Sequence, residues 1–302
     1  MLGSVPDLVL AIFGPTASGK TAVAEALADR IPAEIVSADS MQVYRGLPIL
    51  TNQSGLPMRL VGVWPLDHEA SLGEYQQLAQ AAIDEILAAG GTPVVVGGTG
   101  LYLRAALADL RLPPAPEPGA RERWEKLYDG EGAEHAHALL AELDPGAAAA
   151  VHPNDRRRVV RALELAGKQR ERDRLWKDET RHPTLVFGLE VPKDELHRRI
   201  ETRAKAMFQA GVVEEVRRAL TGDVSSTARH AMGLREIAEL PEAAARDVVI
   251  ARTKRYAAYQ RKWMRRIPGL VSLPANRPPG EIADAILEVA RARQRLPAGR
   301  AG

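Results

Sequence analysis

The segment GPTASGKT at residues 14–21 has the residue types and the spacing of a phosphate-binding loop. Its glycines allow backbone N–H groups to turn around an anion, and the helix expected after the loop adds its positive N-terminal end. Lys20 supplies a cation, and the Thr21 hydroxyl suits a Mg²⁺ ion that bridges phosphate oxygens. The predicted phosphate contacts are Gly14, Pro15, Thr16, Ala17, Ser18, Gly19, Lys20 and Thr21, with Thr21 also the predicted metal ligand. The loop alone does not distinguish a triphosphate from a pyrophosphate on another organic group.

A carboxylate, Asp39, ends the apolar run AEIVSADS at residues 33–40. In an open parallel sheet the carboxyl ends of the strands face the ligand crevice, so Asp39 is expected to point towards whatever the loop holds. A helix N-cap or a turn explains an aspartate here equally well. Two further features count against an ordinary kinase: the strand TPVVVGG ends in glycine rather than in a metal-binding acid, and no arginine-rich lid follows the core helices.

The elements that must position these residues alternate between strands and helices. Short apolar runs typical of buried parallel strands occur at 8–14, 33–40, 92–98 and 184–191, and helical patterns at 21–30 and 72–89. This alternation predicts an α/β fold with a P-loop-type parallel sheet flanked by helices. We expect a core of residues 1–111 and 183–302, with helices from 193 to 267, and a helical insertion at 112–182 that begins with the proline-rich RLPPAPEPGA. The final RLPAGRAG is expected to be disordered.

The bulk composition excludes several classes of protein. The 302 residues suit one large domain or a core with an insertion, and the absence of cysteine excludes disulfides and thiolate metal sites. The net charge of +2 imposes no global field that would favour nucleic acid. No apolar run reaches the roughly 18 residues needed to span a membrane, so we expect a cytoplasmic protein. The seven histidines form no metal-binding pattern.

Four motifs together resemble the tRNA dimethylallyltransferases, also called tRNA isopentenyltransferases, in that family's order. They are GPTASGKT, SADSMQVYRGL, GGTGLYLRA and HPNDRRRVVRALE, and HAMGLREI and TKRYAAYQRKWMRR are similar to its C-terminal motifs. The family transfers a dimethylallyl group from its pyrophosphate ester to N6 of adenosine 37, beside the tRNA anticodon. The resemblance implies that dimethylallyl pyrophosphate and a tRNA anticodon loop are the partners and that the loop binds pyrophosphate. The lack of a C-terminal zinc finger favours a bacterial-type enzyme, which we expect to be monomeric.

The resemblance also assigns roles to individual residues. Asp39 would accept the proton of the attacking adenine amine, Thr99 would contact the substrates, and Lys20 with Mg²⁺ would stabilise the leaving pyrophosphate. The positions that match the family's tRNA contacts are Asp39, Ser40, Met41, Gln42, Thr99, Arg121, Arg157, Arg158, Val159, Val160 and Arg161. Gln42 is suited to reading an adenine edge by paired hydrogen bonds.

The segment TNQSGLPMRL departs from the family's pattern. Thr51 is kept, but Gln53 replaces a lysine and Met58-Arg59 replace paired histidines. Arg59 is a candidate compensating charge. The roles that the family gives to these positions are therefore not carried over to this chain.

Three alternatives remain at this point. They are a P-loop small-molecule kinase, a prenyltransferase acting on free adenine nucleotides, and a non-catalytic RNA-binding protein that retains the loop. The basic residues of the insertion and of TKRYAAYQRKWMRR favour a polynucleotide partner over a free nucleotide. The aromatic residues of that last segment are expected to pack in the core.

Overall fold

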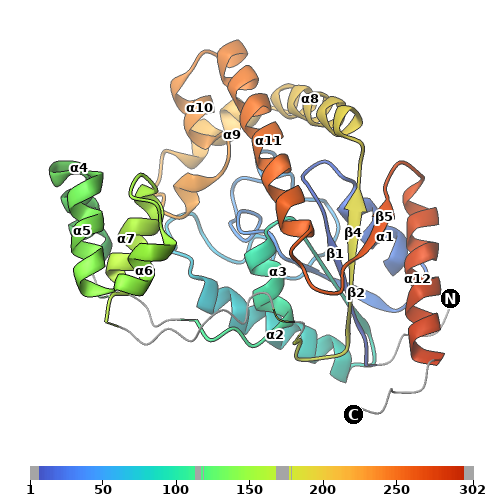
Figure 1. Cartoon of the computed structure of the whole chain (residues 1–302). Coiled ribbons are helices and arrows are strands. Elements are labelled where there is room, and N and C mark those ends of the chain that lie inside the picture. The colour runs from blue at the N-terminus through green and yellow to red at the C-terminus, as the bar shows by residue number, and fades with distance from the viewer. Residues whose placement is uncertain (1–6, 113–116, 118, 168–176, 178, 296–302) are drawn as a thin grey trace, which may run out of the picture. The chain divides into compact units, whose positions relative to one another are not determined.

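The structure is a computed structural model that describes residues 7–112, 117, 119–167, 177 and 179–295 (Figure 1). The chain forms two compact units. The first contains Met1–Leu110 and Leu175–Gly302, and the second contains Arg111–Arg174. Most of the predicted disordered segment RLPAGRAG, residues 296–302, and part of the proline-rich RLPPAPEPGA lie outside the described residues.

The first unit is built on a five-stranded parallel sheet with the order β2-β3-β1-β4-β5. The strands are β1 (Val9–Phe13), β2 (Ala33–Ser37), β3 (Thr92–Gly97), β4 (Thr184–Glu190) and β5 (Val271–Pro274). In β1 and β3 every residue is buried, as expected for parallel strands covered on both faces. The predicted parallel α/β sheet flanked by helices is thus confirmed.

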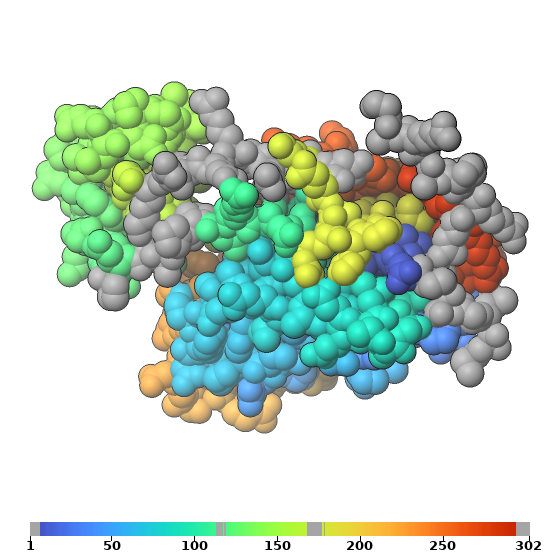
Figure 2. Space-filling view, turned by 90° about the horizontal axis from the view of Figure 1, so that it is seen from below, coloured from blue at the N-terminus to red at the C-terminus, as the bar shows by residue number. Residues whose placement is uncertain are grey.

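Helices cover both faces of this sheet. The helices of the first unit are α1 (Lys20–Ala28), α2 (Leu72–Ala88), α3 (Gly100–Leu107), α8 (Lys193–Gln209), α9 (Val212–Ala219), α10 (Leu234–Glu239), α11 (Glu242–Met264) and α12 (Pro279–Arg295), with a 3-10 turn η2 (Ala228–His230). Alternate strand residues such as Leu10, Ile12 and Phe187 join α1, α8 and α12 in one apolar cluster. Helices α2 and α3 pack beside each other and against β1, β2 and β3. Figure 2 views the molecule from a side where α2, in cyan to teal, forms part of the surface.

Two elements of this unit have no counterpart in the sequence-based expectation, β5 and α12. The edge strand β5 has only four residues, too few for a recognisable alternation. Helix α12 does carry a signal, because Pro279 stands at its first position and Ile282, Ile286 and Ala290 recur every four residues on its buried face. It packs against α1, where Arg30 pairs with Asp284 at 2.6 Å.

In its described residues, the second unit has four α-helices around a small core of its own. They are α4 (Ala120–Glu131), α5 (Ala133–Leu143), α6 (Pro145–Ala150) and α7 (Arg156–Glu164). Ala136, Leu140 and Val159 are fully buried in that core. Asp144 and Asp155 cap α6 and α7 by accepting backbone N–H bonds. The unit covers residues 111–174, compared with the insertion expected at 112–182.

Within the first unit, the chain leaves and re-enters the core at neighbouring points. The Arg181 N–H donates to the carbonyl oxygen of Leu107, at the end of α3, over 2.9 Å. The Arg181 guanidinium also pairs with Asp84 and Asp109. Among the described residues, no helix is long and apolar enough to cross a bilayer.

Candidate active site

Three loops meet at the carboxyl end of the sheet, after β1, β2 and β3. The loop after β1 contains residues 14–19, the loop after β2 contains Asp39, and the loop after β3 contains Thr99. The Ala38 N–H donates to the carbonyl oxygen of Val96 over 2.7 Å. A side chain at Gly97 would overlap the carbonyl oxygen of Ala38, so glycine is needed for this close approach. The sheet order therefore places the predicted phosphate loop, carboxylate and threonine at one edge.

The phosphate loop has the left-handed backbone that such loops need, at Ala17 (φ 63°) and Gly19 (φ 91°). Two of its N–H groups are used internally, because Thr16 donates to the Gln260 side chain at 2.7 Å and Ser18 donates to the Pro15 carbonyl at 3.1 Å. In the part of the chain that the structure describes, the N–H groups of Ala17, Gly19, Lys20 and Thr21 donate to no protein atom. These four N–H groups, at the start of α1, are the ones available to an anion.

Lys20 lies beside this loop with its Nζ donating to the Pro15 carbonyl over 2.9 Å. Burial lowers the pKa of Lys20 from 10.5 to about 8, the negative charge of Asp39 raises it, and the charge of Arg203 lowers it. The ammonium is thus desolvated, and a bound phosphate group would supply the negative charge that it lacks.

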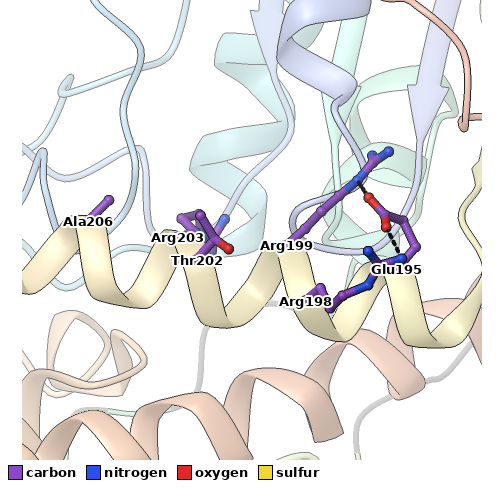
Figure 3. A pocket seen from close by; sticks show the side chains of 6 residues that line it. All are labelled: Glu195, Arg198, Arg199, Thr202, Arg203 and Ala206. Atoms are coloured by element: carbon purple, nitrogen blue, oxygen red, sulfur yellow. Dashed lines mark hydrogen bonds and ion pairs between the residues drawn. The ribbon is translucent and has the colours of Figure 1, made fainter.

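A second cation, Arg203 on α8, faces the same region. Burial lowers the pKa of its guanidinium and Asp39 raises it. Arg203 lines a cavity of about 470 Å³ along α8 with Thr202, Ala206 and three charged side chains (Figure 3). Those three pair with one another, because Glu195 contacts Arg198 at 2.5 Å and Arg199 at 2.8 Å, which leaves one net positive charge. In contrast, no hydrogen bond or ion pair engages Arg203 within the described part of the chain.

Asp39 forms a tight turn, and only one of its two carboxylate oxygens has a hydrogen-bond partner among the described residues. Its Oδ1 accepts the N–H of Met41 at 2.9 Å and that of Gln42 at 3.4 Å. The Ser40 N–H approaches the Thr99 hydroxyl at 3.5 Å, which brings Thr99 beside the Asp39 turn. Thr99 is also the N-cap residue of α3, but its hydroxyl makes no capping bond and instead contacts the Ser40 N–H and Tyr256. Asp39 is therefore both a turn residue and a neighbour of the phosphate loop, so the two explanations given for it from the sequence do not exclude each other.

Tyrosine hydroxyls complete the surroundings of Asp39. Burial, with a smaller contribution from the Asp39 charge, raises the pKa of Tyr256 to about 12, while hydrogen bonds with Thr99 and Gln260 lower it. Burial likewise raises the pKa of Tyr75 and Tyr102, with Asp39 contributing to both. The Tyr75 hydroxyl donates to the Ser37 carbonyl over 2.9 Å. At neutral pH the carboxylate therefore faces neutral hydroxyls and two cations, an arrangement suited to accepting a proton beside an anionic leaving group.

The comparisons with known proteins agree with this geometry. The family model described as IPP transferase matches residues 42–267, and one described as Isopentenyl transferase matches residues 7–59. This chain belongs to the IPP transferase family. A tRNA dimethylallyltransferase of Acidothermus cellulolyticus is 42% identical over 302 residues, which cover 94% of this chain and 92% of that relative. One of Corynebacterium jeikeium is 39% identical over 286 residues, with 89% and 92% covered.

A solved structure supports the same assignment. The full-length tRNA isopentenylpyrophosphate transferase from Bacillus halodurans is 29% identical to this IPP transferase, with a TM-score of 0.69. The similarity covers 96% of this chain and 98% of that one. The family resemblance and the bacterial type expected from the sequence motifs are confirmed.

In this IPP transferase, the segment after Asp39 uses its polar groups internally. The Gln42 amide accepts from the Ser37 hydroxyl at 3.1 Å and donates to the carbonyls of Thr51 and Asn52 at 3.2 and 3.0 Å. Gln53 donates to the Gln42 and Tyr44 carbonyls. Gln42 would have to exchange these bonds to read an adenine edge.

Other positions of this segment also have internal partners. Thr51 donates to the Leu47 carbonyl at 2.7 Å. Arg59 pairs with Glu34 at 2.9 Å and Glu85 at 3.2 Å, on the surface. Arg59 is therefore held by two carboxylates, and the structure offers no support for its action as a compensating charge at the phosphate loop.

The predicted RNA contacts in the second unit lie on α4 and α7. Arg121 and Arg161 both pair with Glu164, whose side chain is fully buried, at 3.0 and 2.6 Å. Arg158 pairs with Asp155 at 3.4 Å, and Arg157 is exposed without a partner among the described residues.

Val159 and Val160, predicted with these arginines, are buried at 0% and 3% exposure. Their side chains pack α7 rather than face solvent. The two valines therefore fix α7, and with it the positions of the arginines that neighbour them in the sequence.

The oxygen donors at the loop fit a Mg²⁺ ion. The Thr21 side chain is partly exposed and makes no hydrogen bond in the described chain, so its hydroxyl can serve as a metal ligand. No group of three His, Cys, Asp or Glu residues that could hold a metal occurs in the ranges that the structure describes. A hydroxyl with phosphate oxygens and water is the type of coordination that Mg²⁺ prefers.

Two residues at this site were missed by the sequence reasoning, Arg203 and Gln260. Arg203 lies on a helix rich in charged residues, where nothing in the sequence distinguishes it from Arg198 or Arg199. Gln260 lies at helical spacing from Tyr256 and Trp263, and a polar amide between aromatic residues expected in the core is the sequence signal that marks it. A buried amide needs partners, and here both partners belong to the active-site loops.

Proposed function

We propose that this protein transfers a dimethylallyl group from dimethylallyl pyrophosphate to N6 of adenosine 37 of tRNA, beside the anticodon. The observation that carries the proposal is the unused oxygen of Asp39 next to a phosphate loop with two desolvated cations. Membership of the IPP transferase family supports prenylation of tRNA, rather than phosphorylation of a small molecule, as the activity.

The proposed reaction is a nucleophilic substitution at the allylic carbon. The N6 lone pair forms a bond to C1 of the dimethylallyl group, and the bond between C1 and the pyrophosphate oxygen breaks with its electron pair leaving on pyrophosphate. The proton lost from N6 would pass to Oδ2 of Asp39, since Oδ1 accepts the turn's N–H groups. Thr99 is positioned to orient the amine. A base of this kind contributes on the order of 10²- to 10⁴-fold in rate.

The phosphate loop would stabilise the negative charge that develops on pyrophosphate. Lys20, Arg203 and the N–H groups of residues 17, 19, 20 and 21 surround the place where it would lie. Mg²⁺ bound to the Thr21 hydroxyl and to phosphate oxygens would supply further positive charge.

The second unit would hold the tRNA. Its arginines, Arg121, Arg157, Arg158 and Arg161, are at least partly exposed and suited to phosphate contacts. The target base must leave its stack, which costs least in a single-stranded loop. Because one chain supplies every proposed catalytic group, we expect a monomer, which light scattering would check. We also expect the protein to work in the cytoplasm, which cell fractionation would check.

The test uses purified protein, Mg²⁺, labelled dimethylallyl pyrophosphate and an unmodified tRNA with adenosines at and beside position 37. Label should appear in the RNA and map to adenosine 37. Asp39→Asn keeps an oxygen for the Met41 N–H but removes the base, so it should transfer label at least about 10²-fold more slowly. Transfer to free AMP but not to tRNA, or normal transfer by Asp39→Asn, would overturn the substrate or the base, respectively.

A further inference from the structure

Gln260 of α11 connects two of the active-site loops. Its Oε1 accepts the Thr16 N–H of the phosphate loop at 2.7 Å, and its Nε2 donates to the Gly98 carbonyl, next to Thr99, at 2.8 Å. The side chain is 3% exposed. A third neighbour is Tyr256, which hydrogen-bonds with both Gln260 and Thr99.

The amide satisfies both loops from one side chain and does so without depending on pH. Thr16 offers a donor and Gly98 an acceptor, so the bridging group must accept on one side and donate on the other. The absence of a side chain at Gly98 makes room for it, because a Cβ there would overlap Nε2 of Gln260. A Cβ at Gly100 would similarly overlap Trp263, one turn further along α11. Helix α11 is thus fitted closely against the Thr99 loop.

We propose that Gln260 is a positioning residue that fixes the distance between the bound pyrophosphate and the proton-accepting side of the site. The inference rests on the proposed prenyl transfer. Thr16 belongs to the loop that would hold the leaving group, and Gly98 immediately precedes Thr99. If the two loops move relative to each other, C1 of the donor moves relative to Asp39 and the incoming amine. A displacement of about 1 Å in such a geometry costs on the order of 10²-fold in rate.

Two substitutions at Gln260 separate positioning from folding. Gln260→Met has a similar size but leaves the Thr16 N–H and the Gly98 carbonyl unpaired. In Gln260→Glu, the protonated carboxyl offers one acceptor and one donor, as the amide does, whereas the ionised form only accepts and repels the Gly98 carbonyl. Gln209→Glu, the same change at an exposed residue of α8, is the matched control.

Transfer of label to tRNA is measured for each variant between pH 6 and pH 8 and divided by the wild-type rate at the same pH. We expect kcat of Gln260→Met to fall on the order of 10²-fold at every pH. The relative rate of Gln260→Glu should rise as the pH falls, since protonation restores the donor. The KM values for both substrates should change much less than kcat, and Gln209→Glu should match the wild type throughout.

The proposal is overturned if Gln260→Met turns over within twofold of the wild type, or if the relative rate of Gln260→Glu is independent of pH. The second criterion decides alone if Gln260→Met does not fold. If the wild type transfers no label, the proposed function fails, and calorimetric binding of inorganic pyrophosphate decides about Gln260. If Gln260→Met binds pyrophosphate several-fold more weakly than the wild type, Gln260 positions the phosphate loop. If the two affinities are equal, that role is refuted.

Discussion

Lys20 is predicted to lower the free energy of unfolding of the protein, although transfer requires it. Its pKa is about 8 in the folded protein and 10.5 when unperturbed, because folding buries the ammonium. A difference of about 2.5 corresponds to about 3 kcal/mol at 1.36 kcal/mol per pH unit. Lys20→Met removes this cost but also the hydrogen bond to the Pro15 carbonyl, which contributes about 1 kcal/mol. The variant should therefore be inactive in transfer yet more stable than the wild type by about 2 kcal/mol at pH 7.

The pH dependence of the difference tests the cause. Between pH 8 and pH 10.5 the unfolded chain binds more protons at Lys20 than the folded protein does, so wild-type stability rises with pH in that window. The advantage of Lys20→Met should thus be full below pH 8 and shrink towards pH 10.5. Urea unfolding at pH 7 and pH 10 measures it. A variant less stable than the wild type at pH 7, or an advantage unchanged at pH 10, would refute the reasoning.

Three further predictions concern charged groups. Arg203→Gln should weaken calorimetric binding of inorganic pyrophosphate about tenfold or more without lowering the melting temperature, because the guanidinium has no protein partner to lose; unchanged affinity would remove Arg203 from the site. Arg157→Gln should weaken tRNA binding and reduce the slope of log affinity against log salt by roughly 0.7 to 0.9, with kcat preserved at saturating tRNA; an unchanged slope would contradict a phosphate contact. Glu164→Gln removes the buried charge that two arginines share, so the second unit should become sensitive to limited proteolysis and the KM for tRNA should rise several-fold; a change in kcat alone would argue against this role.

The sheet was predictable from the sequence because its strands are buried on both faces. Runs such as VVVGG contain consecutive apolar residues, which the parallel arrangement requires, and the loop motif follows the first of them. The edge strand β5 lacked that signal, since only one of its residues is buried. Helix α12 was not predicted, although its apolar residues repeat every four positions along PGEIADAILEVARARQR.

The site was predictable where chemistry is concentrated in a short motif. Lys20 follows directly from strand-loop context. The context also gave the position of Asp39 at the end of the second strand, but its expected role as a base came from the family resemblance. Gln260 and Arg203 do not follow from that context, because their importance depends on where α11 and α8 pack against the loops, and a sequence separation of 244 residues lies between Gln260 and Thr16. The internal bonds of Gln42 were also unpredictable, since the same amide suits a base edge and a neighbouring carbonyl.

The hydrogen bond between Arg181 and Leu107 has a consequence for how this chain can be altered. For the core, everything between these residues is an excursion of roughly 70 residues whose two ends are already held together. Replacing it with about six residues would lower the entropic cost of closing that loop by about 2 kcal/mol. We therefore expect that the second unit can be excised or exchanged while the strands β1 and β4 still pair. Other RNA-binding domains could be inserted into the prenyltransferase core at the same two residues.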